Sequence, residues 1–393
     1  MDVPESIKNL VKEIVKSDNT TNYDIVLHES NKKGEGFMGE IVFFSVVDSD
    51  TKKVVLDLVL KNSLKSVAVR NAFSVRLAFL NEINFYENVW PQLDNFRQQY
   101  KVEPIMNVAR CYGTSTKEMD EYVLLENLKS QGFKMFDKNE FMNLNQFKYI
   151  LRQYGKFHAL SFAFRKQEPN LFADAVGGYR SMFDNPMSGF QQSIDNVCKV
   201  VYSYLRPEDT DAKTVFKKYE DDGWKVFVEA LKYNGPNGVI LHGDCWNNNM
   251  MFKFDNDTFS DMALVDFQIS RVGSPVYDLS YCLYAAATKD ILDKLDELLD
   301  EYFNSLKQML LLFGENVDDI YPYTVFKDEW RRYSKANLIF SFVIWKVRTR
   351  TPEEMIDFND FVKDKKNITV PKSELFKTIT RNLVLHACEI NAL

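Results

Sequence analysis

The chain has few cysteines, no excess of positive charge and no long apolar run. Its five cysteines are scattered, odd in number and never arranged as Cys-x-x-Cys, which disfavours a zinc site and a disulfide framework. A net charge of −7 gives no basic face for nucleic acid. No apolar run is long enough to span a bilayer, and the N-terminus lacks the apolar segment of a signal peptide. We therefore expect a reduced, cytoplasmic chain without a membrane or nucleic-acid partner.

What the chain does have is apolar content and two kinds of periodicity. With 45% hydrophobic residues over 393 positions, it can bury a large core and form two lobes. Alternating apolar runs in the first third predict strands, and a helical pattern from Val67 to Val89 should end at Pro91. Before them, Ile7 to Val15 has the spacing of an amphipathic helix that packs as a cap. The expected strands are Tyr23–Leu27, Ile41–Val47, Val54–Leu60, Val108–Tyr112 and Tyr122–Leu125.

After residue 128 the pattern becomes mainly helical. Phe141 to Phe164 predicts one long helix, residues 170–236 predict helices joined by loops, and the chain beyond Asp278 is nearly all helical. A strand-turn-strand block over residues 238–266 interrupts this pattern. We predict an α+β, two-lobed fold of the protein-kinase type. Residues 1–126 would form a small lobe with an antiparallel sheet and one helix across it, and residues 127–393 a larger, mainly helical lobe.

The block from His242 to Met251 carries the most informative side chains. It reads His-Gly-Asp-Cys-Trp-Asn-Asn-Asn-Met-Met and places Asp244 and Asn249 in a polar turn after an apolar run. A nearby apolar run ends at Asp266, seventeen residues after Asn249. A carboxylate that takes a hydroxyl proton, followed by two oxygen ligands for Mg²⁺, is the set that ATP-dependent phosphoryl transfer requires. Asp244 is therefore the predicted base, and Asn249 and Asp266 are the predicted metal ligands.

A second set of residues is suited to holding a nucleotide. Gly34, Gly36 and Gly39 fit a G-x-G-x-x-G pattern between two expected strands, where glycines let the backbone approach phosphates closely. Lys61 ends the next strand, and Glu82 on the following helix is the carboxylate best placed to hold it extended. Strands on both sides of the glycines disfavour a dinucleotide-binding motif, which would open a helix there.

Three further positions complete the predicted site. Glu126 and Leu128 flank the connection between the lobes, where main-chain groups would recognise adenine. Trp246, in the polar turn, and Gln268, two residues after Asp266, are candidate substrate contacts. His242 and His158 are interpreted as structural histidines. Asp278 should open a helix and can brace the polar turn by hydrogen bonding.

The short distance from Asp266 to Asp278 narrows the class. Asp266-Phe267 is followed by Gln268 instead of glycine, and Asp278 comes only twelve residues after Asp266. No Ala-Pro-Glu sequence follows, so there is little room for a segment that docks a peptide. The acceptor is therefore expected to be a small molecule and not a protein.

These motifs together resemble the ecdysteroid kinase-like (choline-kinase-like) family of insects, relatives of aminoglycoside phosphotransferases and choline kinases. The specific parts are His-Gly-Asp-x-Trp-x-x-Asn at 242–249 and Asp-Phe-Gln at 266–268, and the resemblance covers roughly residues 20–345. It implies a kinase-like fold, ATP with Mg²⁺, and phosphorylation of hydroxyl groups on small molecules, with links to ecdysteroid conjugation and detoxification. Asn127 departs from the acidic residue expected at the hinge.

We therefore predict an ATP- and Mg²⁺-dependent kinase that acts on a hydroxyl of an ecdysteroid or a lipophilic xenobiotic alcohol, without an obligate protein partner. One alternative is a choline or aminoglycoside kinase, because acidic residues are plentiful between 205 and 222 and a cation needs carboxylates or an aromatic cage. Another alternative is a catalytically silent carrier that binds an apolar ligand. The intact set of Lys61, Glu82, Asp244, Asn249 and Asp266 speaks against a carrier.

Overall fold

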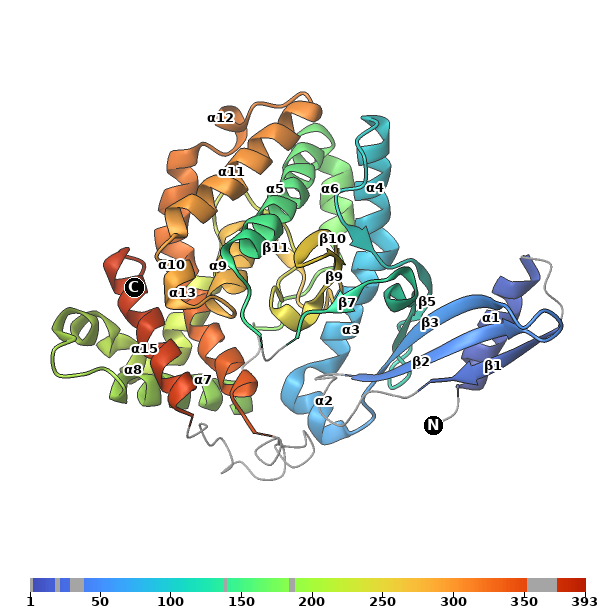
Figure 1. Ribbon diagram of the computed structural model, residues 1–393, viewed down its shortest axis with the longest axis horizontal. Coiled ribbons are helices and arrows are strands. Elements are labelled where there is room, and N and C mark those ends of the chain that lie inside the picture. Colours follow the sequence, from blue (N-terminus) through green and yellow to red (C-terminus); the bar gives the residue numbers. More distant parts are fainter. Residues whose placement is uncertain (1–2, 18–21, 29–38, 138–139, 184–187, 352–372) are drawn as a thin grey trace.

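A computed structural model describes residues 3–17, 22–28, 39–137, 140–183, 188–351 and 373–393. Figure 1 shows a sheet-containing N-terminal part beside a larger helical part. The N-terminal sheet has the order β1-β2-β3-β6-β5, and all its neighbours are antiparallel. Its strands are β1 (Tyr23–Leu27), β2 (Gly39–Asp48), β3 (Val54–Ser63), β5 (Cys111–Ser115) and β6 (Tyr122–Glu126). The predicted small antiparallel sheet is thus confirmed.

The first helix, α1 (Glu5–Ser17), covers one face of this sheet. Its Ile7, Val11 and Val15 recur every four residues, so they share one face of the helix. All three are buried against a cluster that includes Phe44 and Leu58. Burying each of these side chains stabilises the fold by roughly 1.5–3 kcal/mol. The predicted cap is confirmed.

The helical stretch that follows β3 is divided, and it does not stop at Pro91. It comprises α2 (Val67–Phe73), α3 (Val75–Asn84), a π-helical turn η1 (Phe85–Val89) and α4 (Trp90–Gln99). Ser74 adopts a left-handed conformation between α2 and α3. Within η1 the Trp90 N–H bonds to the Phe85 carbonyl five residues back, so a new helix starts at Trp90. Pro91 then lies in the first turn of α4, where a missing N–H costs nothing. The predicted stop was therefore wrong.

The C-terminal part is built around α5 (Leu144–Gln167), a helix that a capping box of Asn143 and Gln146 begins. The other helices pack around it and around α13. They are α6 (Pro169–Val176), α7 (Ser188–Ser203), α8 (Thr210–Leu231), α9 (Val276–Tyr284), α10 (Lys289–Leu292), α11 (Leu295–Leu312), α12 (Val317–Ile320), α13 (Tyr323–Arg348) and α15 (Glu374–Glu389). The predicted helical character of this part is confirmed, and so is the α+β class.

Short strands carry the polar turn in this helical part. A four-stranded sheet has the order β4-β10-β9-β7, and β8 pairs with β11. These strands are β4 (Asn107–Val108), β7 (Lys134–Met135), β8 (Val239–Leu241), β9 (Met250–Asp255), β10 (Thr258–Leu264) and β11 (Arg271–Gly273), and 3₁₀ turns lie at η2 (Leu128–Gln131) and η3 (Asn247–Asn249). The strand expected over 108–112 is divided, because β4 pairs in parallel with β10 whereas β5 joins the N-terminal sheet. Among the described residues, no helix is long and apolar enough to cross a membrane.

Candidate active site

Lys61 lies between two carboxylates that come from different parts of the chain. Its Nζ is 2.8 Å from Glu82 Oε2 on α3 and 2.7 Å from Asp266 Oδ1 after β10. The Glu82 side chain is 1% exposed, whereas Asp266 is 31% exposed. Burial lowers the pKa of Lys61, but Asp266 and Glu82 outweigh it and the pKa of Lys61 is raised. Burial raises the pKa of Glu82 to about 7, against the opposing effect of Lys61. The predicted Lys61–Glu82 pair is therefore present.

Gln268 belongs to this ionic cluster. In the amide orientation that satisfies both neighbours, its side-chain oxygen accepts from Lys61 Nζ at 3.1 Å and its nitrogen donates to Asp266 Oδ1 at 3.2 Å. The side chain is buried. Gln268 was predicted as a substrate contact, but it lies on the phosphate side of the site. It holds Lys61 and Asp266 together.

Asp266 has an unusual backbone that its neighbours stabilise. Its φ of 69° is left-handed, a conformation that non-glycine residues rarely adopt. The next side chain, Phe267, stacks on Phe85 of η1 with ring centroids 3.4 Å apart and planes 8° apart. It also meets His242 edge-on at 4.7 Å. Phe267 thus connects Asp266 to the π-helical turn and to the polar turn at once.

Asp244 is held by two hydrogen bonds that the turn and α9 supply. Tyr281 donates its hydroxyl to Asp244 Oδ1 at 2.8 Å, and Asn249 donates Nδ2 to Asp244 Oδ2 at 2.7 Å. Burial and the nearby Asp266 charge raise the pKa of Asp244 to about 7, although both hydrogen bonds and Lys61 lower it. A carboxylate with a pKa near 7 can accept a proton from a hydroxyl group and release it again at neutral pH. The geometry fits the predicted base.

Asp278 braces the backbone of the polar turn. Its carboxylate accepts the N–H of His242 at 2.8 Å, the N–H of Gly243 at 2.9 Å and Nε2 of His158 at 3.3 Å. His158 Nδ1 lies 3.1 Å from the Tyr302 hydroxyl, and both His158 and Asp278 are fully buried. Burial raises the pKa of Asp278, but the hydrogen bond and charge of His158 outweigh it and the pKa is lowered. Bracing was one of the two roles suggested for Asp278.

The ring of His242 is fixed as a neutral tautomer. Its Nε2 lies 2.9 Å from the Val265 carbonyl, which can only accept, and its Nδ1 lies 3.2 Å from the Asp244 N–H, which can only donate. The proton is therefore on Nε2. Burial lowers the pKa of His242, against the effect of Asp278. His242 is structural, as predicted, and connects the turn to the strand end that delivers Asp266.

Two glycines are required by close packing. Gly243 has a φ of 88°, and a Cβ there would lie 2.3 Å from the Ile269 carbonyl oxygen. A Cβ on Gly39 would lie 2.7 Å from the Asn62 carbonyl oxygen and 3.1 Å from the Phe79 ring. Gly34 and Gly36, the other two glycines of the predicted phosphate loop, lie outside the described residues.

The connection between the two parts is braced through Asn127. Its N–H bonds to the Asp57 carbonyl at 2.8 Å, and its side chain bonds to Asp57 Oδ1 at 3.2 Å. It also caps η2 by accepting from the Lys129 N–H. Glu126 ends β6 and Leu128 begins η2, so both main chains lie on this connection. An amide serves here because the contacts are to a carboxylate and to a main-chain N–H.

Trp246 and Tyr281 differ from what the sequence suggested. Trp246 is buried and belongs to the main hydrophobic core, so packing accounts for its size. Tyr281 was not predicted, although it lies three residues after Asp278 on α9 and therefore near the same face of that helix. That spacing was the available signal.

Asn249 and Asp266 can serve as ligands for Mg²⁺. Both offer oxygen donors, which this hard cation prefers. Asn249 Nδ2 is used on Asp244, so its Oδ1 is the end left for a cation. Asp266 is the more exposed of the two carboxylates beside Lys61. In the part of the chain that the structure describes, no group of three or more His, Cys, Asp or Glu side chains could hold a metal by itself.

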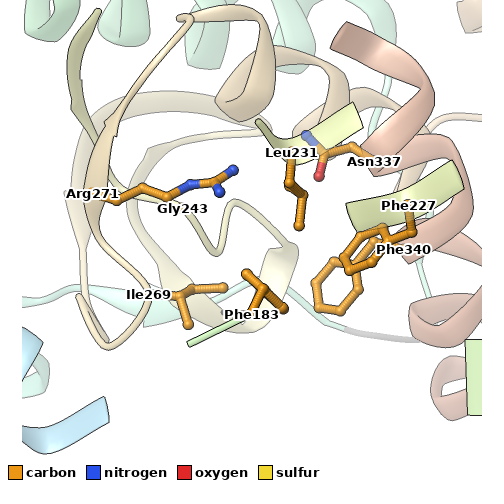
Figure 2. A pocket seen from close by; sticks show the side chains of 8 residues that line it. All are labelled: Phe183, Phe227, Leu231, Gly243, Ile269, Arg271, Asn337 and Phe340. Carbon is orange, nitrogen blue, oxygen red and sulfur yellow. The ribbon is translucent and has the colours of Figure 1, made fainter. Parts of the chain in front are cut away.

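A small cavity adjoins the polar turn (Figure 2). Apolar side chains make up most of its wall, and Arg271 and Asn337 contribute polar groups. Its lining residues are Phe183, Phe227, Leu231, Gly243, Ile269, Arg271, Asn337 and Phe340. Asn337 donates Nδ2 to the Tyr277 carbonyl and to Ser280 Oγ, which leaves its oxygen as an acceptor. The accessible volume is about 10 Å³, so these side chains must move to admit anything larger than water.

Comparisons with known proteins give a family and a set of structures. Residues 33–315 match the family described as ecdysteroid kinase-like. A structure of wild-type aminoglycoside 2'-phosphotransferase-IIIa in its GDP complex is 15% identical with a TM-score of 0.41, covering 92% of this chain and 99% of that chain. A macrolide 2'-phosphotransferase from Brachybacterium faecium is 12% identical with a TM-score of 0.39, covering 93% of this chain and 100% of that chain. No curated protein matches.

Proposed function

The chain belongs to the ecdysteroid kinase-like family, and from this premise we propose that it transfers the γ-phosphoryl group of ATP to a hydroxyl group of a small molecule. One observation carries the proposal: two sets of side chains lie close together. Lys61, Glu82 and Asp266 form the first set, and Asp244 with Asn249 forms the second. The charges of Asp266 and Lys61 act on Asp244. The first set suits phosphates and the second suits an acceptor hydroxyl.

In this proposal the N-terminal part holds the nucleotide. Lys61 binds phosphate oxygens, and Glu82 keeps its ammonium group extended from β3. The backbone around Gly34, Gly36 and Gly39 covers the phosphates, and the main chains of Glu126 and Leu128 bind the base. We place the boundary between the nucleotide-binding lobe and the acceptor lobe after residue 126, where the N-terminal sheet ends.

Asn249 and Asp266 would hold Mg²⁺. When bound, the ion neutralises charge on the phosphate oxygens of the nucleotide. Asp266 now pairs with Lys61, so nucleotide binding gives Lys61 a second anionic partner. Asn249 keeps its Nδ2 bonds to Asp244 throughout, because its oxygen and its nitrogen face different partners.

Asp244 would take the proton of the acceptor hydroxyl. Each carboxylate oxygen already accepts one hydrogen bond, and each has a second lone pair. Tyr281 and Asn249 fix the plane of the carboxylate and lower its pKa. A base positioned in this way contributes about 10²–10⁴-fold to the rate.

The cavity beside Gly243 is the proposed entrance of the acceptor. It is next to Asp244 in the chain, and its walls are mainly phenylalanine, leucine and isoleucine. These side chains favour a lipophilic alcohol such as an ecdysteroid or a xenobiotic. The Asn337 oxygen can accept a hydrogen bond from a second hydroxyl of that acceptor, and Arg271 contributes a guanidinium group to the wall (Figure 2).

A choline or aminoglycoside kinase is less well supported. The only charged side chain that lines the described cavity is Arg271, and a cationic acceptor would be repelled by it. The acidic run between 205 and 222 lies on the surface of α8 and the turn before it, and its Asp209 pairs with Arg381 of α15. A carrier would not need the Asp244–Asn249 pair.

A substrate screen tests the proposal. Purified protein with Mg-ATP is incubated with ecdysteroids, phenols, glycosides, choline and aminoglycosides, and phosphorylated products are detected by mass. We expect phosphorylation of lipophilic alcohols by the parent protein and none by Asp244→Asn. Absence of any product would refute the kinase proposal. A thermal shift caused by Mg-ATP distinguishes a kinase from a carrier.

All five cysteines are free. This supports a reducing compartment, and we propose the cytoplasm. We propose a small-molecule acceptor and no obligate protein, nucleic-acid or membrane partner.

A further inference from the structure

A stretch of chain after α6 is attached to α3, the helix that carries Glu82. Asn81 bonds twice to Arg180: its Nδ2 donates to the Arg180 carbonyl at 2.9 Å, and its Oδ1 accepts the Arg180 N–H at 2.9 Å. One turn further along, Asn84 Nδ2 donates to the Ala175 carbonyl at 3.1 Å. Both asparagine side chains are buried. Residues 175–183 are called the latch segment below.

Asn81 also contacts the chain that follows Asp266. The same Nδ2 donates to the Gln268 carbonyl at 3.2 Å, so both amide hydrogens and the oxygen of Asn81 have partners. The Tyr179 hydroxyl of the latch segment lies 2.8 Å from Ser270 Oγ, and Ser270 donates to the Leu241 carbonyl. The latch segment, α3 and residues 268–270 are therefore connected by buried hydrogen bonds.

Both connected segments end in the wall of the cavity. Phe183 lies at the end of the latch segment, and Ile269 follows Gln268; both line the cavity (Figure 2). At the other end, Asn81 is the residue before Glu82, and Glu82 holds Lys61. A continuous set of contacts thus leads from the cavity wall to the phosphate-binding lysine.

We propose that Asn81 is a positioning residue that couples the cavity to nucleotide binding. A ligand in the cavity must displace Phe183 or Ile269, because the space between the lining side chains is small. The displacement changes the position of Arg180 and Gln268, to which Asn81 is fixed. Since buried hydrogen-bond partners cannot be replaced by water, α3 and Glu82 move with them. The inference rests on the proposed function, because Lys61 must bind phosphates for the coupling to matter.

Such coupling is reciprocal. If a ligand in the cavity strengthens nucleotide binding, a bound nucleotide strengthens acceptor binding by the same factor. ATP would then be held in the reactive arrangement mainly when an acceptor is present, which limits transfer of the phosphoryl group to water.

A double-mutant cycle on nucleotide affinity tests the coupling. The probe is Mg²⁺ with AMPPNP, a non-hydrolysable ATP analogue, and the dissociation constant is measured by calorimetry for the full chain. Phe183→Ala loosens the latch segment, and Asn81→Ala disconnects it from α3. We expect each single variant to weaken binding about fivefold or more. The double variant should bind no more weakly than Asn81→Ala alone, because the two changes interrupt the same contacts.

Phe340→Ala is the matched control. Phe340 lines the same cavity but comes from α13, outside the latch segment, so its loss should leave the dissociation constant within about twofold. The coupling is refuted if Phe183→Ala and Asn81→Ala act additively, or if Phe340→Ala weakens binding as much as Phe183→Ala. If Asn81→Ala does not fold, the comparison of Phe183→Ala with Phe340→Ala decides by itself. No binding by the parent chain would instead refute the proposed function, and with it the coupling.

Discussion

Replacing Asp278 by asparagine tests the brace beneath the polar turn. The carboxylate accepts from the N–H groups of His242 and Gly243 through different oxygens. An amide has only one oxygen, so either orientation leaves one of these buried N–H groups facing an NH₂ group. His158 can adapt by changing its tautomer, but a main-chain N–H cannot.

The expected cost follows from these contacts. One buried N–H without an acceptor costs about 1–3 kcal/mol, and the two remaining hydrogen bonds lose about 1 kcal/mol each when the acceptor is no longer charged. Asp278→Asn should therefore destabilise the fold by about 3–5 kcal/mol. With an unfolding entropy of about 2.1 cal/mol/K per residue over 393 residues, this lowers the Tm by about 4–6 °C.

Thermal unfolding followed by circular dichroism measures this change. The control is Asp328→Asn, which alters an exposed carboxylate paired with Arg331 and should shift the Tm by less than about 1 °C. The parent should also lose stability below about pH 4. The folded pKa of Asp278 is lowered, so its contribution is present above the unfolded pKa and lost as pH falls through the folded value. If Asp278→Asn unfolds within about 1 °C of the parent at neutral pH, the brace has been assigned too large a role.

Three further predictions concern the same site. First, because the pKa of Asp244 is raised to about 7, the folded state holds its proton between about pH 4 and 7 and loses stability as pH rises across that window. Asp244→Asn should then melt at a higher temperature than the parent at pH 8 but not at pH 4, while kcat/KM of the parent falls below about pH 7; a parent-like melting profile would contradict the raised pKa. Second, Lys61→Met leaves Glu82 buried without its cation and should cost about 3–5 kcal/mol in urea unfolding. Adding Glu82→Gln should recover part of this, and a double variant as unstable as the single one would show that the pair is not energetically coupled. Third, Gly243→Ala brings a Cβ against the Ile269 carbonyl and should destabilise the chain more than Gly314→Ala. Gly314 has a φ of 74° but no neighbouring atom within 4 Å, so it measures the strain of the left-handed backbone alone, about 1–2 kcal/mol; equal Tm losses would argue against the close contact.

Local patterns were sufficient to predict the elements that position the site. The resemblance to the ecdysteroid kinase-like family is confirmed, and the observed sheet and helices agree with the predicted kinase-like, two-lobed fold. Lys61 at a strand end and Glu82 on the next helix were paired correctly because only a few residues in the chain could meet there. Asp278 was predicted to open a helix, and it does so in α9.

Other features depended on contacts that no local pattern contains. Pro91 stops a helix in most contexts, but here a π-helical turn restarts the helix just before it. Gln268 has the same composition signal whether it faces a substrate or Lys61. Asn81 looks like an ordinary polar residue on a helix, and its three partners at Arg180 and Gln268 are distant in sequence.

The sequence by itself determined the chemistry of this protein: which side chains can serve as base, metal ligands and phosphate-binding cation, and in which order they occur. It could do so because those roles require particular residue types at the ends of strands, and strand ends are visible as changes in periodicity. Only the tertiary structure decided how these groups are held. The pKa of Asp244, the neutral ring of His242 and the attachment of Asn81 all depend on burial and on partners from other segments, and both are properties of the packed chain.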